Sequence, residues 1–349
     1  MLVDIYTLHN AYNYGAFLQA YAMQEVLGTM GASVRFRAAN AVADPDAAAY
    51  GSRSEKLGIC LRALTQPRMA LHYFIRNRRM RRSAKLLNTD TGGGRAALCL
   101  LGSDEIWNIS NARVGFVPEF FGIGTGCKKV AAYAVSAGRV FAPELPEEAA
   151  EAIGVIDSFS ARDGMTRQLY EDVTGKNCEV VLDPVFLYDW KSFTAPKKAR
   201  RPYLLIYGRF TDSDIIEAVK AYADSHAMQT LSSGIYNGWC DRNTAPDPFG
   251  FLSQLMSACG VVTNTFHGTA FSLIFGKHAA VLPETAKVGD LLRLLGAKTA
   301  RCDGPGQIGQ ALSRPITDTA VNAAIDRYRV SSHAYLKRAL GMKPDVTGS

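Results

Sequence analysis

The sequence predicts an α/β protein with two parallel-sheet domains that face each other across a cleft. The chain has 349 residues, 48% of them hydrophobic and 20% charged, which is too long for one ordinary core and suits two domains. Short apolar segments alternate with helical segments in both halves, the pattern of parallel sheets. A basic segment bounded by prolines, 196–202, separates the halves. We therefore expect an N-terminal domain at 1–196, a C-terminal domain at 197–318 and a closing helix at 319–349.

The N-terminal half opens with a strand, a helix and a second strand. Residues 3–8 are apolar and end in a polar turn that contains Gly15. Residues 16–30 repeat apolar side chains at helical spacing, and Gly31 ends that helix. Residues 40–56 indicate a loop and residues 57–87 a basic helix. Strands are predicted at 33–37, 96–101, 129–135, 155–160 and 179–182.

The C-terminal half repeats the alternation. Asp212 is a plausible N-cap for a first helix at 213–226. Strands are predicted at 203–207, 228–232, 261–263 and 279–282. Further helices are predicted at 247–257, 268–275, 287–295 and 320–340.

The net charge of +7 is concentrated in two clusters: Arg76, Arg78, Arg79, Arg81, Arg82 and Lys85; then Lys197, Lys198, Arg200 and Arg201. A basic surface attracts phosphorylated ligands, lipid diphosphates or anionic membranes. The alternative is a solvated helix face and a basic linker. Nucleic acid is not expected as a partner, because the clusters lack interleaved aromatic residues and no helix-turn-helix or RNP pattern occurs.

No sequence pattern indicates a metal or a nucleotide cofactor. The seven cysteines include no Cys-x-x-Cys pair, and the six histidines are far apart. The glycine-rich stretch 122–128 precedes a strand, whereas a dinucleotide loop precedes a helix, so it predicts a turn. The first residues lack a secretory signal pattern, and no apolar run reaches the roughly 20 residues of a membrane span. A cytoplasmic protein is expected.

Three strand-end turns are unusually polar: 9–15, 102–108 and 263–269. A helix that starts at such a turn offers free backbone N–H groups to an anion. Simple helix capping, by Thr265 or Thr269 for example, is the alternative. The residues alone predict a two-domain α/β enzyme with an anion-binding cleft.

These turns also carry a family resemblance, which covers about residues 1–300. Residues 13–22, Asn-Tyr-Gly-Ala-Phe-Leu-Gln-Ala-Tyr-Ala, and 102–108, Gly-Ser-Asp-Glu-Ile-Trp-Asn, resemble segments of the polysaccharide pyruvyl transferase family. Residues 133–138, 160–163, 181–187 and 263–272 resemble four further motifs of that family, in the same order. Glu105 stands where the family usually has glutamine.

The resemblance implies two Rossmann-like domains in a glycosyltransferase-B-like fold. It implies phosphoenolpyruvate as the donor and a pyruvate ketal on a sugar of a cell-envelope or secreted polysaccharide as the product. The acceptor would be a glycan or a lipid-linked saccharide. The basic clusters would then contact the anionic inner face of the membrane peripherally. No metal or organic cofactor is implied.

Site residues carried over from the resemblance fall into three groups. The catalytic candidates are His267, Asp104 and Glu105. The donor-binding candidates are Arg162, His267, Gly268, Thr269, Thr265 and Lys287. The acceptor-binding candidates are His9, Asn13, Tyr14, Trp107 and Asn108.

Each main candidate has a structural alternative. His267 could be a buried packing residue, Arg162 could pair with Asp163 or Asp183, and Asp104 and Glu105 could cap a helix. Thr265 and Lys287 occupy positions where other members carry arginine, and lysine lacks the planar fork of arginine.

Two other functions compete with pyruvyl transfer. A nucleotide-sugar glycosyltransferase on the same architecture would need pockets for a base and a diphosphate. A non-catalytic module that binds glycans or membranes would use only the basic clusters.

Overall fold

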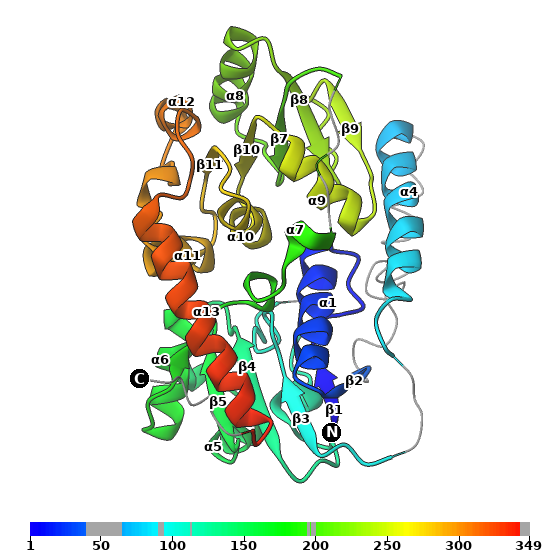
Figure 1. The fold of residues 1–349 in the computed structure, drawn as a ribbon, viewed down its shortest axis with the longest axis vertical. Helices are drawn as coiled ribbons and strands as arrows, with labels where there is room; N and C mark the ends of the chain where they lie inside the picture. Colours follow the sequence, from blue (N-terminus) through cyan, green and yellow to red (C-terminus); the bar gives the residue numbers. More distant parts are fainter. Residues whose placement is uncertain (40–64, 90–93, 112–113, 194–195, 197–199, 343–349) are drawn as a thin grey trace.

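The computed structural model describes residues 1–39, 65–89, 94–111, 114–193, 196 and 200–342. It contains two parallel sheets, one in the lower and one in the upper half of the molecule in Figure 1. The prediction of an α/β fold with two parallel-sheet domains is confirmed. The predicted loop at 40–56 and residues 57–64 of the predicted basic helix lie outside the described residues.

The N-terminal sheet has six strands in the order β2-β1-β3-β4-β5-β6, and every pairing is parallel. Helices cover both faces of such a sheet, which is why its central strands are nearly all apolar and buried. The strands are β1 (Leu2–Tyr6), β2 (Ser33–Phe36), β3 (Leu98–Leu101), β4 (Val130–Val135), β5 (Ser158–Ala161) and β6 (Glu179–Val180).

Helices α1 and α6 of this half begin at side-chain caps. The Asn13 side chain accepts a hydrogen bond from the Gly15 backbone at the start of α1, and the Asp163 side chain accepts one from Thr166 at the start of α6. The sequence analysis did not place α5 or α6. The helices are α1 (Tyr14–Thr29), α4 (Pro67–Ala84), η2 (Pro118–Phe121), η3 (Ala142–Glu144), α5 (Glu147–Gly154), α6 (Gly164–Thr174), η4 (Pro184–Phe186) and α7 (Trp190–Phe193).

The C-terminal sheet has five parallel strands in the order β11-β10-β7-β8-β9. Its strand order reverses between β7 and β10, which creates a switch point at the carboxyl ends of these strands. The strands are β7 (Tyr203–Tyr207), β8 (Gln229–Ser233), β9 (Arg242–Thr244), β10 (Gly260–Thr263) and β11 (Ala279–Val281). The helices are α8 (Ser213–Ser225), α9 (Pro248–Ser257), α10 (Phe266–Ile274), α11 (Ala286–Leu295), η5 (Lys298–Ala300), η6 (Pro305–Gln307) and α12 (Ile308–Leu312).

The last helix, α13 (Thr319–Ala339), runs back from the C-terminal half onto the N-terminal sheet (Figure 1). The Tyr335 hydroxyl donates to the Ala132 carbonyl at 2.8 Å, and the Leu182 N–H donates to Ser332 Oγ at 2.9 Å. Both domains are thus tied together by the end of the chain as well as by the linker.

Helix α4 makes the reverse crossing, from the N-terminal half to the C-terminal domain. Arg79 donates to the Ala245 carbonyl at 2.6 Å, and the Tyr236 N–H donates to the Tyr73 hydroxyl at 3.3 Å. The helix stands along the right-hand edge of the molecule in Figure 1. Within the described residues, no helix is both long and apolar enough to cross a bilayer.

One cluster of buried apolar side chains spans both domains. Helix α1 lies at its centre. The Phe17 ring meets Phe249 edge-on at 5.8 Å, and the Tyr14 ring stacks on Phe251 at 5.3 Å between ring centroids. The domains therefore share an apolar, packed contact.

Candidate functional site

The N-termini of α1 and α10, one from each domain, meet face to face. Gly15 lies against the His267 ring so closely that a Cβ atom at position 15 would lie 2.0 Å from His267 Nδ1. Only glycine allows this approach. Two of the three polar turns identified in the sequence are therefore brought together across the domain interface.

Arg162, which directly follows β5, lies buried beside this contact. Its Nη1 is 3.1 Å from Asp183 Oδ2 and 3.5 Å from Asp104 Oδ1, and its guanidinium carbon is 4.4 Å from the Phe266 ring centre. The structural pairing with Asp183 anticipated from the sequence is present. It engages only part of the guanidinium, because Nε and Nη2 are buried without a hydrogen-bond partner among the described residues.

His267 adds a third unsatisfied nitrogen. Its Nε2 is also buried without a hydrogen-bond partner in the described structure. Asp183 Oδ2 lies 3.9 Å away, close enough for electrostatic attraction but too far for a hydrogen bond. Buried polar atoms are almost always paired, so three unpaired nitrogens on two neighbouring side chains mark a place suited to bind a polar ligand.

Electrostatics set the charge of this cluster. Burial lowers the pKa of His267 below its usual value, although Asp183 and Asp104 act in the opposite direction. The lowered pKa favours a neutral imidazole at pH 7. Burial opposes the charge of Asp104, but Arg162, His267 and Lys287 outweigh it and lower the pKa of that carboxyl. The pKa of Arg162 is raised in spite of its burial, because Asp104 and Asp183 stabilise the cation.

Lys287 and Glu105 form an ion pair between the domains at the edge of the cluster. Lys287 Nζ on α11 is 3.0 Å from Glu105 Oε1, and each side chain keeps about a fifth of its surface exposed. The pair therefore lies between the buried cluster and solvent. Five of the predicted catalytic and donor-binding side chains, His267, Asp104, Glu105, Arg162 and Lys287, are brought into one site.

The remaining donor candidates build the start of α10. The Gly268 N–H donates to Thr265 Oγ1 at 3.0 Å, and Thr269 Oγ1 donates to the Thr265 carbonyl at 2.9 Å. A Cβ on Gly268 would collide with Thr263. Thr269 is fully buried and Thr265 caps α10, so the capping expected as an alternative is present.

Three of the acceptor-binding candidates, Trp107, Tyr14 and His9, have side chains that are packed inside the protein. Trp107 is fully buried, and its indole N–H donates to the Phe120 carbonyl at 2.8 Å. Tyr14 is 3% exposed and fills the C-terminal domain core. His9 is buried against Thr7 and Phe36, and burial lowers its pKa to about 4.

The two other acceptor candidates keep some surface. Asn13 is exposed beside the start of α1, and its side chain caps that helix. Asn108 is half-buried and packs against the backbone of Gly138. They stay predictions.

The sequence analysis anticipated Asp183 only as a partner of Arg162, and it assigned no role to Phe266. Asp183 receives both Arg162 and His267, and Phe266 forms the face beneath Arg162. Their signal was present in the sequence, since Asp183 follows the predicted strand 179–182 and Phe266 adjoins His267 in the same motif. No group of three metal-ligating side chains occurs among the described residues.

Comparisons with known proteins support the family resemblance noted in the sequence. A model of the polysaccharide pyruvyl transferase family matches residues 13–284. No curated protein sequence matches the chain.

Solved structures share its fold. The S. aureus MnaA–UDP structure is 12% identical over 99% of both chains, with a TM-score of 0.50. A putative UDP-N-acetylglucosamine 2-epimerase from Listeria monocytogenes is 12% identical over 97% of this chain and 90% of its own, also at 0.50. The spinosyn rhamnosyltransferase SpnG with thymidine diphosphate is 14% identical, covers 98% of this chain and 100% of its own, and has a TM-score of 0.46. At such identities the two structures with a TM-score of 0.50 show the fold alone, which is glycosyltransferase-B-like as predicted.

The family match covers most of the chain and includes Gly15, Asp104, Arg162, Asp183 and His267, all of which the fold gathers at one site. The chain belongs to the polysaccharide pyruvyl transferase family.

Proposed function

We propose that the protein transfers the enolpyruvyl group of phosphoenolpyruvate onto a sugar of a cell-envelope or secreted glycan, or its lipid-linked precursor, as a pyruvate ketal. The observation that carries this proposal is the buried Arg162, whose Nε and Nη2 lack partners beside the orphaned Nε2 of His267. A planar pair of N–H donors matches a carboxylate, and a neighbouring imidazole N–H suits a phosphate oxygen.

The proposed reaction divides the donor between these groups. Arg162 holds the donor carboxylate through Nε and Nη2, while Asp104 and Asp183 keep the guanidinium oriented. His267 and Lys287 contact the phosphate. No metal ion or organic cofactor is part of the proposal, and activity is expected to survive treatment with a chelator.

Ketal formation requires two proton movements. The methylene carbon of the donor gains a proton and becomes a methyl group, and the central carbon becomes oxocarbenium-like. One sugar oxygen bonds to this carbon, the bond to the phosphate oxygen breaks, and a second sugar oxygen closes the ketal. The two sugar hydroxyls lose one proton each. One of these protons compensates for the proton that the methylene carbon gained, and the other leaves with the phosphate. Asp104 or Glu105 would accept a hydroxyl proton, and His267 would supply one once protonated.

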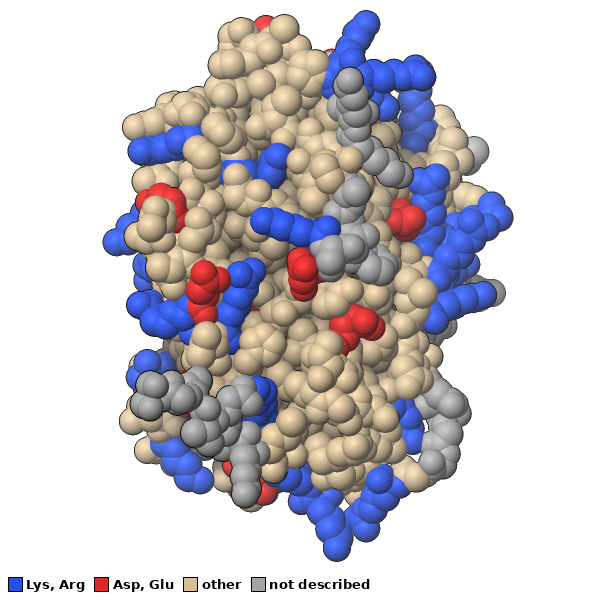
Figure 2. Space-filling view, in the orientation of Figure 1, with Lys and Arg blue, Asp and Glu red and all other residues tan. Residues whose placement is uncertain are grey.

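The basic helix α4 favours a location at the membrane surface. The structure separates its cations into two sets. Arg76, Arg79 and Arg81 bond to Gly234, Ala245 and Tyr12, although Arg79 and Arg81 also keep exposed surface. Arg78, Arg82 and Lys85 form the second set and are exposed. Figure 2 shows basic side chains along the edge where α4 lies in Figure 1.

Apolar side chains accompany the exposed cations. Leu71 is 59% and Phe74 65% exposed, on the same helix face as Arg78 and Arg82. Helix α4 contains no acidic residue. Basic residues beside exposed Leu and Phe are the composition of helices that lie on anionic bilayers. We therefore include peripheral contact of a cytoplasmic enzyme with the inner membrane face, where a lipid-linked acceptor would be found.

Ligand-induced stabilisation tests the donor assignment. Phosphoenolpyruvate is expected to raise the melting temperature of the wild-type protein, since a ligand that binds only the folded state stabilises it. His267→Ala and Arg162→Lys should lose most of this shift, the latter because lysine keeps the charge but not the fork. Arg167→Lys, a surface arginine on α6, is the matched control and should respond as wild type.

The same titration includes uridine diphosphate and a panel of nucleotide sugars. A shift with these ligands and none with phosphoenolpyruvate would replace the proposal by a nucleotide-sugar glycosyltransferase. Equal shifts in wild type, His267→Ala and Arg162→Lys would remove both residues from the donor site.

A further inference from the structure

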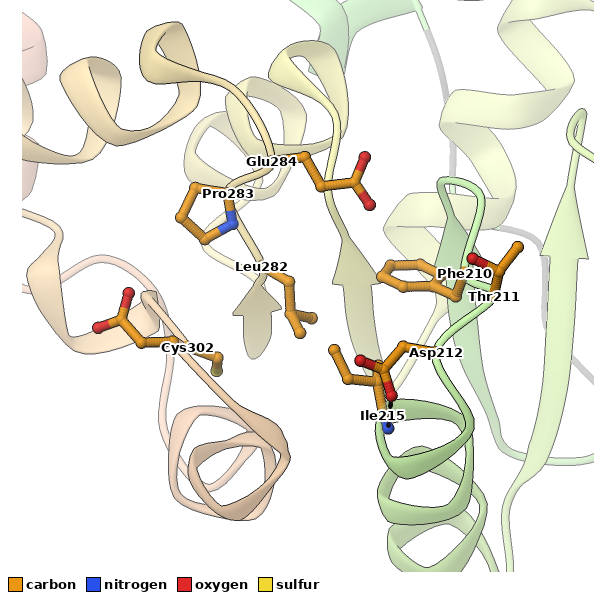
Figure 3. Close-up of a pocket in the computed structure, with 9 residues that line it drawn as sticks. Phe210, Thr211, Asp212, Ile215, Leu282, Pro283, Glu284 and Cys302 are labelled. Carbon is orange, nitrogen blue, oxygen red and sulfur yellow. Dashed lines mark hydrogen bonds between the residues drawn. The ribbon is translucent and has the colours of Figure 1, made fainter.

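A separate pocket of about 240 Å³ lies at the carboxyl edge of the C-terminal sheet. The loops after β7 and β11 and the first turn of α8 form its walls (Figure 3). β7 and β11 flank β10, and the strand order reverses at β7 and β10. Ligands of open parallel sheets bind beyond the carboxyl ends of the strands at such a reversal. The pocket therefore occupies the place where this fold is suited to hold a ligand.

The pocket combines an apolar floor with an acidic rim. Phe210, Leu282 and Cys302 are buried at 6%, 7% and 2% exposure and supply the floor. Asp212, Glu284 and Asp303 are exposed residues of its lining, and Figure 3 shows Asp212 and Glu284 coming from different elements. Such a pocket offers a flat apolar surface together with several hydrogen-bond acceptors.

Each rim carboxylate has acceptor capacity to spare. Asp212 Oδ1 accepts from the Asp214 N–H at 2.9 Å, and Glu284 Oε1 accepts from Asn264 Nδ2 at 2.6 Å. Asp303 Oδ1 pairs with Arg301 Nε at 2.7 Å. In all three, the hydrogen bonds among described residues engage one oxygen, and an ionised carboxylate accepts through both.

The charge of this pocket selects its ligand. Three carboxylates repel a phosphate or carboxylate, so the anionic donor belongs with Arg162 and not here. Ionised carboxylates can only accept hydrogen bonds, so the ligand must supply the donors. Neighbouring hydroxyl groups on a ligand ring are such donors. The face of a sugar ring is apolar enough to lie on Phe210. The chemistry fits one uncharged, hydroxyl-rich ring.

The pocket is also connected to the donor site. Asn264, which bonds Glu284, lies three residues before His267. The segment that forms the pocket wall at Leu282–Glu284 continues directly to Lys287, which pairs with Glu105 of the other domain. Both sites thus lie on the same edge of one sheet.

We propose that this pocket binds a sugar residue of the acceptor glycan. The proposal rests on the proposed function, which requires such an acceptor. It moves acceptor recognition from the packed residues Tyr14 and Trp107 to the C-terminal domain, through Phe210, Asp212 and Glu284.

Saturation-transfer NMR on the full chain tests the proposal with methyl glycosides of galactose, glucose, mannose and N-acetylmannosamine as probes. At least one glycoside is expected to bind. The double variant Asp212→Asn/Glu284→Gln should bind it about tenfold more weakly, because two charged acceptors are removed. Asparagine still caps α8, so folding is retained. Glu217→Gln, an exposed neutral-isostere change elsewhere on α8, is the control and should bind as wild type.

Three results would overturn the proposal: no glycoside binds, the double variant binds as well as the control, or uridine binds in the pocket while the glycosides do not. Phosphoenolpyruvate stabilisation is measured on the same samples. If glycosides do not bind but phosphoenolpyruvate still raises the melting temperature, the acceptor pocket is wrong and the proposed function stands. Glycoside binding without any phosphoenolpyruvate shift would instead count against the donor and leave the pocket in place.

Discussion

At the scale of single residues, the unsatisfied nitrogens of Arg162 and His267 cost stability in the empty protein. A buried donor without a partner costs about 1–3 kcal/mol. The fold tolerates this at Arg162 because Asp183 and Asp104 balance its charge and Phe266 covers one face. A ligand that supplies the missing acceptors recovers that cost on binding.

The charge balance at this site predicts that donor binding takes up a proton. Arg162 and Lys287 face three carboxylates, those of Asp104, Glu105 and Asp183, so the empty site does not favour an anion. Burial keeps the pKa of His267 below 6.5 in the free protein. A bound anion stabilises the imidazolium and raises that pKa, so binding is strongest at low pH and weakens as pH rises through the window between the two pKa values.

Calorimetry of phosphoenolpyruvate binding at pH 6, 7 and 8, in buffers of different ionisation enthalpy, measures this uptake. The dissociation constant should rise by up to about tenfold per pH unit within the window. His267→Gln keeps a polar side chain without titration and serves as the reference, since titration of the phosphate itself is common to both proteins. Identical proton uptake in the two proteins would exclude His267 as the titrating group.

At the scale of elements, helix α4 has two faces with different surroundings. Its inner face ties the helix to the C-terminal domain through Arg76 and Arg79, and its outer face presents Leu71, Phe74 and exposed cations. The inner cations are structural and the outer ones are available to a partner. The sequence shows how many cations α4 carries, but it does not show which of them face the C-terminal domain.

Neutralising Arg78, Arg82 and Lys85 to glutamine is expected to weaken binding to vesicles of phosphatidylcholine and phosphatidylglycerol about 100-fold, at about 1 kcal/mol per cation. Phe74→Ser should weaken it further, because the ring inserts between headgroups. Sedimentation with the vesicles measures both effects.

Matched controls lie elsewhere on the surface. The triple change of Lys220, Lys298 and Arg314 to glutamine removes the same charge, and Phe141→Ser removes a phenylalanine that is 59% exposed. Both controls should bind as wild type. If the controls and the α4 variants lose binding equally, only net charge matters and α4 is not the contact surface.

At the scale of the whole molecule, Tyr14 couples the two domains. It stands at the first position of α1 in the N-terminal half, yet its ring stacks on Phe251 and lies over Gly234, and its hydroxyl donates to the Pro246 carbonyl. The same turn holds Gly15 against His267. Domain coupling and site geometry therefore depend on one short segment.

Tyr14→Ala is expected to lower the free energy of unfolding by about 3–5 kcal/mol and to split the calorimetric transition into two, since each domain then unfolds more independently. Tyr170→Ala is the control, because Tyr170 is equally buried but packs on Phe159 within the N-terminal domain. It should lower stability without a split. A single unshifted transition in Tyr14→Ala would show that α13 and the linker alone hold the domains together.

The sequence by itself determined the two parallel sheets and the family. Strand–helix alternation follows from local chemistry, because apolar runs such as 98–101 and 260–263 bury both faces wherever they are placed. The short polar turns are local as well, so Asp104, Arg162 and His267 could be recognised one by one.

Only the tertiary structure decided which of these residues meet and which are packed away. Side chains at adjacent positions, such as Tyr14 and Gly15 or Trp107 and Asn108, differ in surroundings because neighbouring elements arrive from distant parts of the chain. The pairing of Lys287 with Glu105, the burial of Trp107 and the acidic pocket by Glu284 all depend on contacts between segments far apart in sequence. The local sequence determines the chemical type of each side chain, but packing between distant segments determines which groups surround it.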